Sequence, residues 1–196
     1  MSRLFVFLLS TIFLVANCLD SPKSQMGLEA NWTGIDLATN QVVSLADTGF
    51  ETLALNVYSP TCIPCFKELP ALERIHARLK KDPKFGLFLV VDPIQVSETT
   101  SGDFQTEEPL ARAKAIMQAE VIKRKISIPI LLMNRPFAVS NEAFVTATPE
   151  TILVRTKPWN IYYNFIGSLS EKEEISQIDS DPRIQFFFHT LGARNL

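Results

Sequence analysis

Short apolar runs alternate along this chain with longer segments in which apolar residues recur at helical spacing. Runs rich in branched and aromatic side chains predict strands at residues 41–45, 53–58, 85–91, 128–133, 150–155 and 161–166. The runs at 53–58 and 85–91 are almost wholly apolar, which is typical of strands buried on both faces of a sheet. The last two strands flank residues 157–160 and form a predicted hairpin.

Helical periodicity predicts helices between these strands. Residues 63–80 are expected to form a helix directly after the strand at 53–58, because apolar positions recur there every three or four residues. These positions are Leu69, Leu72, Ile75, His76 and Leu79. Pro109 is expected in the first turn of a second helix that runs to about Lys125. The polar residues 95–108 before it are predicted to be a loop, after a strand that ends at Asp92 and Pro93.

A closing helix is expected near the C-terminus, with Ser168 or Ser170 as its cap. Its first turn would hold acidic residues near the positive end of the helix dipole. These residues are Glu171, Glu173 and Glu174. Farther on, the phenylalanines at 186–188 are consecutive, so they cannot all face one core. The order of elements predicts an α/β fold with a central mixed β-sheet flanked by helices.

The first residues show a different pattern. Arg3 precedes the apolar run 4–16, which is shorter than the roughly 20 residues that span a bilayer and fits a secretory signal. We therefore expect a signal peptide at 1–17, a tether at 18–30 and an exported protein. Residues 14–18 resemble a bacterial lipoprotein box, in which Cys18 would carry the lipid; an ordinary cleaved signal with a spare thiol is the alternative.

Length and composition limit the expected number of domains and the classes of partner. The chain has 196 residues, 46% of them hydrophobic, which is enough for one substantial core. Its 19 basic and 21 acidic side chains give a net charge of −2 and form no basic stripe. Nucleic acid is therefore not expected as a partner.

The candidate chemistry lies at Cys62 and Cys65, where a predicted strand passes into a predicted helix. Thiols three positions apart on a first helical turn can close a small disulfide ring. The helix N-terminus favours a thiolate at Cys62, which would attack, with Cys65 as the resolving thiol. Pro64 is tolerated so early in a helix. A structural disulfide and half of a metal site are the alternatives; further zinc ligands would have to come from Cys18, His76 and His189.

Residues 55–70 resemble the active-site segment of the TlpA and ResA branch of thioredoxin-like thiol–disulfide oxidoreductases. The resemblance rests on Asn56, the cysteine pair, Glu68 and Pro70. It implies a thioredoxin-like fold over 31–196, with an N-terminal extension and an insertion at 95–108 before the cis-proline region. It also implies that Glu68 transfers a proton to or from the thiol pair as the disulfide opens. The alternative is that Glu68 is a solvated carboxylate on the helix surface.

The same resemblance assigns the surroundings of the cysteines. The rim of the site would be formed by Pro60, Thr61, Ile63 and Pro64. Tyr58 and either Pro60 or Thr61 replace two aromatic residues that the family commonly has before its first cysteine.

The second family signature is the segment at Thr148 and Pro149, just before the strand at 150–155. Thioredoxin-like proteins have a cis-proline there. We therefore expect Pro149 to be cis and the backbone of Thr148 to pair with a substrate chain. A trans proline that merely opens a strand is the alternative.

The activity that the resemblance implies is disulfide exchange on protein substrates outside the cytoplasm, without a cofactor or metal. It favours a reductant, as in cytochrome c maturation, that receives electrons from a membrane donor. The protein would be periplasmic, or anchored to the membrane through Cys18. A thiol peroxidase and a non-catalytic copper-binding or docking module on the same scaffold remain as alternatives.

Overall fold

The computed structural model describes residues 31–97 and 107–193. The expected signal peptide at 1–17 and the tether at 18–30, including Cys18, lie outside the described residues. The strands are β1 (Thr33–Asp36), β2 (Val42–Ser44), β3 (Thr52–Val57), β4 (Phe85–Val91), β5 (Ile130–Met133), β6 (Glu150–Thr156) and β7 (Trp159–Ile166). The helices are η1 (Leu45–Asp47), α2 (Ile63–Leu79), α3 (Pro93–Ser97), α4 (Glu107–Arg124), α5 (Ile175–Asp179) and α6 (Pro182–Leu191).

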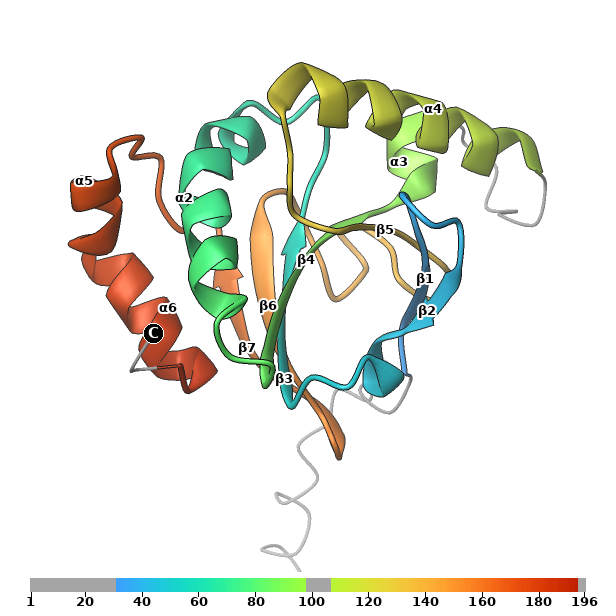
Figure 1. The fold of residues 1–196 in the computed structure, drawn as a ribbon. Helices are drawn as coiled ribbons and strands as arrows, with labels where there is room; N and C mark the ends of the chain where they lie inside the picture. The colour runs from blue at the N-terminus through green and yellow to red at the C-terminus, as the bar shows by residue number, and fades with distance from the viewer. Residues whose placement is uncertain (1–30, 98–106, 194–196) are drawn as a thin grey trace, which may run out of the picture.

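The strands form one mixed seven-stranded sheet in the order β2-β1-β5-β4-β3-β6-β7, so β3 and β4 lie near its middle (Figure 1). β3 pairs in parallel with β4, and β4 in parallel with β5. Both connections step across the sheet in the same direction. Because such crossovers are right-handed, α2 and α4 are placed on the same face. The predicted α/β fold with a central mixed sheet flanked by helices is confirmed.

Two apolar clusters form the core, one on each face of the sheet. Buried side chains of α2, α4, α5 and α6 share the first cluster with Ala54 and Leu89 of the sheet. The second contains Leu53 and Leu55 of β3 together with Trp32, Leu45, Phe137 and Val145, so η1 and the segment before β6 cover that face. Alternate residues of β3 therefore serve opposite clusters, and every residue of this strand is buried.

The long strands and the first helix lie close to their predicted positions, whereas β1 was not predicted. The segment predicted as a loop at 95–108 is helical at both described ends, as α3 ends at Ser97 and α4 starts at Glu107. Asp92 caps the start of α3, where its Oδ1 accepts from the N–H of Ile94 at 3.0 Å, and Pro93 fits the first turn.

The predicted closing helix at Ser168 or Ser170 is wrong. Residues 168–174 contain no helix, and α5 begins only at Ile175. The Ser170 hydroxyl oxygen accepts from the N–H of Lys172 at 3.3 Å, but no helix follows, and the hydroxyl donates to Asp181 Oδ2 at 2.7 Å. Asp181 also caps α6 by accepting from Arg183 N at 2.9 Å.

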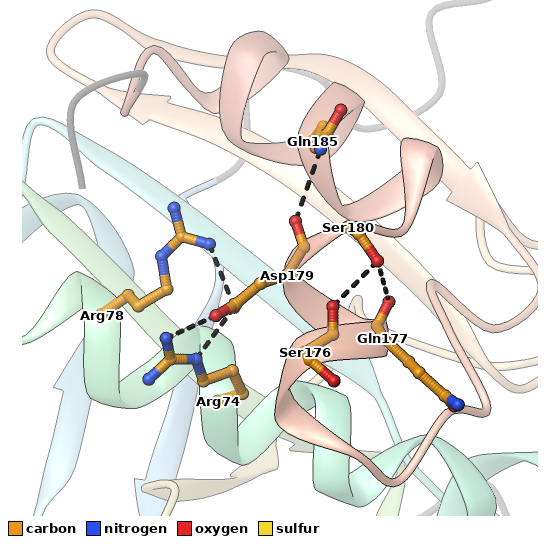
Figure 2. A network of polar contacts seen from close by, with 7 residues as sticks. All are labelled: Arg74, Arg78, Ser176, Gln177, Asp179, Ser180 and Gln185. Carbon is orange, nitrogen blue, oxygen red and sulfur yellow. Dashed lines mark hydrogen bonds and ion pairs between the residues drawn. The ribbon is translucent and has the colours of Figure 1, made fainter.

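An ion-pair cluster fastens α5 against α2. Arg74 donates two hydrogen bonds to the Asp179 carboxylate, at 2.9 Å and 2.6 Å, and Arg78 approaches the same carboxylate at 3.5 Å (Figure 2). These contacts lower the pKa of Asp179 below its ordinary value, chiefly through the hydrogen bonds from Arg74. The cluster is half-buried and holds the C-terminal helices on the helix that carries the cysteines.

Candidate active site

The cysteine pair lies where β3 leads into α2. β3 ends at Val57, Tyr58 and Ser59 remain buried, and the chain then turns to the surface before α2 starts at Ile63. Cys62 is the N-cap residue of α2, with an extended backbone, and its Sγ accepts from the N–H of Cys65 at 3.2 Å. The N–H of Cys65, which has no carbonyl partner within the first turn, therefore points at the Cys62 sulfur.

Cys62 and Cys65 form a disulfide with a Cα–Cα distance of 5.3 Å, within the common range of about 4.4–6.8 Å. The two sulfur-bearing residues differ in exposure. Cys62 is half-buried, whereas Cys65 has no exposed surface. A partner molecule can therefore reach Cys62 and not Cys65.

The four residues expected at the rim lie at the surface around Cys62. Thr61 and Pro64 are exposed, Pro60 is half-buried, and Ile63 is 60% exposed. An isoleucine this exposed beside a disulfide gives the surface an apolar contact point next to the sulfur that can be reached.

Glu68 lies one helical turn after Cys65, on the same side of α2, and is fully buried. Its carboxylate accepts hydrogen bonds from the Asn56 side chain at 3.2 Å and from the N–H of Leu169. The interpretation of Glu68 as a solvated helix carboxylate is therefore wrong. Burial raises the pKa of Glu68 to about 7, against the opposing effect of the hydrogen bonds from Leu169 and Asn56.

This raised pKa predicts that Glu68→Gln flattens the pH dependence of stability. Between its ordinary pKa and about 7, the folded protein keeps a proton on Glu68 that the unfolded chain has lost. Stability therefore falls as pH rises through this window, by up to about 1.4 kcal/mol per pH unit. Urea unfolding from about pH 5 to about pH 8 measures the slope.

Comparing the pH slope of Glu68→Gln with that of the unaltered protein isolates the contribution of Glu68. Burial lowers the pKa of His76, which gives the opposite trend, but His76 is present in both proteins and cancels in their difference. Glu173→Gln, which removes an exposed carboxylate, serves as the matched control and should keep the unaltered slope. Equal slopes for Glu68→Gln and the unaltered protein would contradict the prediction.

Sequence reasoning missed a polar cluster beside the cysteines. The Tyr58 hydroxyl donates to Glu120 Oε1 at 2.7 Å, and Arg124 bonds the same oxygen. The Arg124 guanidinium also lies over the Phe66 ring, 3.8 Å from its centroid. The end of α4 is thus tied to residues on both sides of the cysteine pair. Glu120 and Arg124 stand four residues apart on a predicted helix, but nothing local indicates their contact with Tyr58.

The segment at Thr148 and Pro149 lies at the same end of β3 as the cysteines. Glu150 opens β6 and pairs with Val57, the last residue of β3, so Pro149 lies just beyond the end of that strand. The Thr148–Pro149 bond is cis, which confirms the predicted conformer. Thr148 is half-buried, and Pro149 is buried.

Other candidate residues do not join this site. His76 is buried on α2 with 7% exposure, and His189 lies in the last turn of α6. Within 31–97 and 107–193, no three side chains of the metal-binding types gather as a candidate metal site. Cys18 is outside the described residues. No helix in the described part of the chain is long and apolar enough to cross a membrane.

The fold is shared with solved thiol–disulfide oxidoreductases. No protein-family model matches the chain, and no curated protein matches it in sequence. A thiol:disulfide interchange protein from Bacteroides sp. superposes with a TM-score of 0.54 at 18% identity, over 85% of this chain and 89% of that one. StoA from Bacillus subtilis gives a TM-score of 0.51 at 18% identity, over 78% of this chain and 98% of StoA.

A secreted thiol-disulfide isomerase from Corynebacterium glutamicum is also similar, with a TM-score of 0.52 at 17% identity, over 80% of this chain and 84% of that one. At these identities the likeness establishes the fold. The chain therefore has the thioredoxin-like fold that the family resemblance of residues 55–70 implies.

Proposed function

We propose that this protein is a thiol–disulfide oxidoreductase that reduces disulfides in protein substrates through Cys62 and Cys65. The observation that carries the proposal is the asymmetric pair at the start of α2, with one sulfur accessible and the other buried behind it. The thioredoxin-like fold, shared with oxidoreductases, supports the same chemistry.

The proposed reaction moves two electrons and two protons to the substrate. The Cys62 thiolate attacks one sulfur of a substrate disulfide, so that a mixed disulfide forms and one substrate thiolate leaves and takes up a proton. Cys65 then loses its proton and attacks Cys62 Sγ. The second substrate thiol is released, and the Cys62–Cys65 disulfide, the bond present in this structure, is restored.

Glu68 is the proposed acceptor for the proton of Cys65. The two side chains are both fully buried and lie on one side of α2, one helical turn apart. A carboxyl group with a pKa of about 7 can take a proton and return it at neutral pH.

The proposed binding edge for a substrate chain is the segment at Thr148 and Pro149, with Pro60, Thr61, Ile63 and Pro64 as the rim. Its support is the register of β6 against β3, which brings Pro149 to the end of the sheet from which the cysteine loop leaves. An extended substrate segment could pair there with exposed backbone while its disulfide meets Cys62.

Reduction of insulin, with dithiothreitol as electron source, tests the proposed activity. Precipitation of the freed insulin chains should be several-fold faster with the protein than with dithiothreitol alone. A peroxidase would instead consume hydrogen peroxide without accelerating insulin reduction, and a copper carrier would bind Cu(I) without it; either result would contradict the proposal.

The proposed location is outside the cytoplasm, with Cys18 as a lipid anchor and a membrane protein as electron donor, in a role such as cytochrome c maturation. The support is the signal-like run at 4–16 and the resemblance of 14–18 to a lipoprotein box. One structural relative is named as secreted.

Cys18→Ser is expected to move the full chain from the membrane fraction to the soluble fraction of cells that process lipoproteins. Immunoblotting of the two fractions measures this, with Cys65→Ser as a control that should stay with the membrane. An unaltered protein found wholly in the soluble fraction would contradict the anchor.

A further inference from the structure

Glu150, the first residue of β6, places a carboxylate in the interior directly after Pro149 and is only 1% exposed. Its Oε1 accepts from the N–H of Thr146 at 3.1 Å, the Thr146 hydroxyl at 2.9 Å and the N–H of Ala147 at 3.0 Å. Its Oε2 accepts from the Asn164 side chain at 2.7 Å. One buried carboxylate therefore fixes two successive backbone N–H groups just before Thr148.

The loop that Glu150 holds is accessible to a partner. Thr146 and Ala147 are exposed, although the carboxylate beneath them is buried. Pro149 is held from the other side, because its carbonyl accepts from the N–H of Gly167 at 2.9 Å. Glu150 itself pairs with Val57, the last residue of β3, so the loop lies at the end of the central strands from which the chain continues to Cys62.

A buried carboxylate is costly unless its oxygens are satisfied by hydrogen bonds, and such charge-assisted bonds are stronger than neutral ones. Glu150 meets this requirement chiefly with the loop itself, since three of its four hydrogen bonds come from Thr146 and Ala147. The burial of Glu150 and the orientation of the loop backbone thus depend on each other.

We infer that Glu150 is a positioning residue, which holds the backbone of residues 146–148 in the orientation that pairs with an extended segment of a substrate protein. The inference rests on the proposed function and deepens it by naming what shapes the binding edge. Glu150 acts through the loop and does not take part in sulfur chemistry. Reduction of a protein therefore depends on it, whereas a small disulfide, which has no chain to pair with the loop, does not need it.

Two conservative variants separate geometry from charge. Glu150→Asp keeps the charge but shortens the side chain by one methylene, which withdraws the oxygen from the loop N–H groups. Glu150→Gln loses the charge but keeps an oxygen within reach of them. The amide nitrogen of the new glutamine would face Asn164. The Asn164 Oδ1 is buried without a hydrogen-bond partner in the described structure, and it can accept from this nitrogen once the Asn164 side-chain amide rotates.

The experiment measures kcat and KM with insulin and, separately, the rate with hydroxyethyl disulfide as the small substrate. We expect Glu150→Asp and Glu150→Ala to raise the insulin KM about tenfold, which is the factor that loss of one or two net hydrogen bonds gives. The rate of hydroxyethyl disulfide reduction should stay within about twofold of that of the unaltered protein. Glu150→Gln should restore the insulin KM. Glu142→Ala, at an exposed glutamate before the same loop, is the matched control.

Hydrogen exchange gives a second readout that does not depend on activity. The amides of Thr146 and Ala147 should exchange faster in Glu150→Asp than in Glu150→Gln and the unaltered protein. If Glu150→Ala does not fold, the Asp and Gln variants decide the matter between them.

An insulin KM for Glu150→Asp equal to that of the unaltered protein would overturn the inference. So would a loss in Glu150→Gln as large as in Glu150→Asp, or an equal loss on both disulfides. If the unaltered protein reduces neither disulfide, the proposed function fails instead, and the exchange of the two loop amides still tests whether Glu150 holds the loop.

Discussion

Replacement of Cys62 by serine is expected to abolish catalysis of insulin reduction, so that insulin precipitates no faster than with dithiothreitol alone, because a hydroxyl cannot replace the thiolate as nucleophile. Cys62 is the sulfur that a partner can reach, and the helix N-terminus favours its ionised form. The initial rate of insulin precipitation with dithiothreitol measures the loss.

Cys65→Ser is the matched variant, because it removes the other sulfur and leaves the nucleophile in place. Cys62 should still attack, but nothing resolves the product, so a mixed disulfide between Cys62 and an insulin chain accumulates. Non-reducing electrophoresis with mass spectrometry identifies this species. Trapping in Cys62→Ser instead of Cys65→Ser would reverse the proposed roles.

Phe187→Ala is expected to cost about 3–5 kcal/mol of unfolding free energy, the usual loss for a large aromatic residue in a packed core. Phe187 has no exposed surface, and its ring centroid lies 5.8 Å from that of Phe165 and 5.5 Å from that of Phe188. Its removal leaves a cavity between α6 and the sheet. Urea unfolding of the oxidised protein measures the change.

The neighbouring Phe186 provides the matched control. It stands next to Phe187 on the same helix but is 46% exposed, so Phe186→Ala should cost less than about half as much. The consecutive phenylalanines at 186–188 therefore divide between core and surface, as their helical spacing requires. Equal losses for the two variants would contradict this division.

The sequence predicts the parts of the fold that local pattern determines. β3 and β4 are recognisable because strands buried on both faces are continuous apolar runs. β1 escapes prediction because it has four residues, includes Gly34, and gains its stability from pairing with β2 and β5. No periodicity within so short a segment distinguishes it from a loop.

The closing helix was misplaced because Ser168 and Ser170 form local bonds, to Glu171 and from Lys172, in a segment that contacts elsewhere in the fold hold in a non-helical conformation. The Leu169 N–H donates to Glu68, which lies 101 positions earlier, and the Ser170 hydroxyl donates to Asp181. Both contacts need the folded chain, so a serine followed by glutamates gives a misleading cap signal.

The candidate site likewise has one part that the local sequence predicts and one part that it does not. Cys62 and Cys65 are three positions apart, so their spacing alone predicts that they can form a disulfide, with half of a metal site as an alternative. The contact between Tyr58 and Glu120 spans 62 positions, and the hold of Glu150 on its loop depends on the burial of that carboxylate. Neither leaves a local signal in the sequence.

The equilibrium reduction potential of the Cys62–Cys65 pair tests the central claim most directly. The domain from residue 31 onward would be equilibrated in dithiothreitol or glutathione buffers, and free thiols trapped by alkylation and counted by mass spectrometry. We expect both cysteines to titrate together as one reversible two-electron couple, closer to the roughly −270 mV of thioredoxin than to the roughly −120 mV of DsbA. Cysteines that titrate separately, or a disulfide that resists reduction in every buffer, would contradict a thiol–disulfide oxidoreductase.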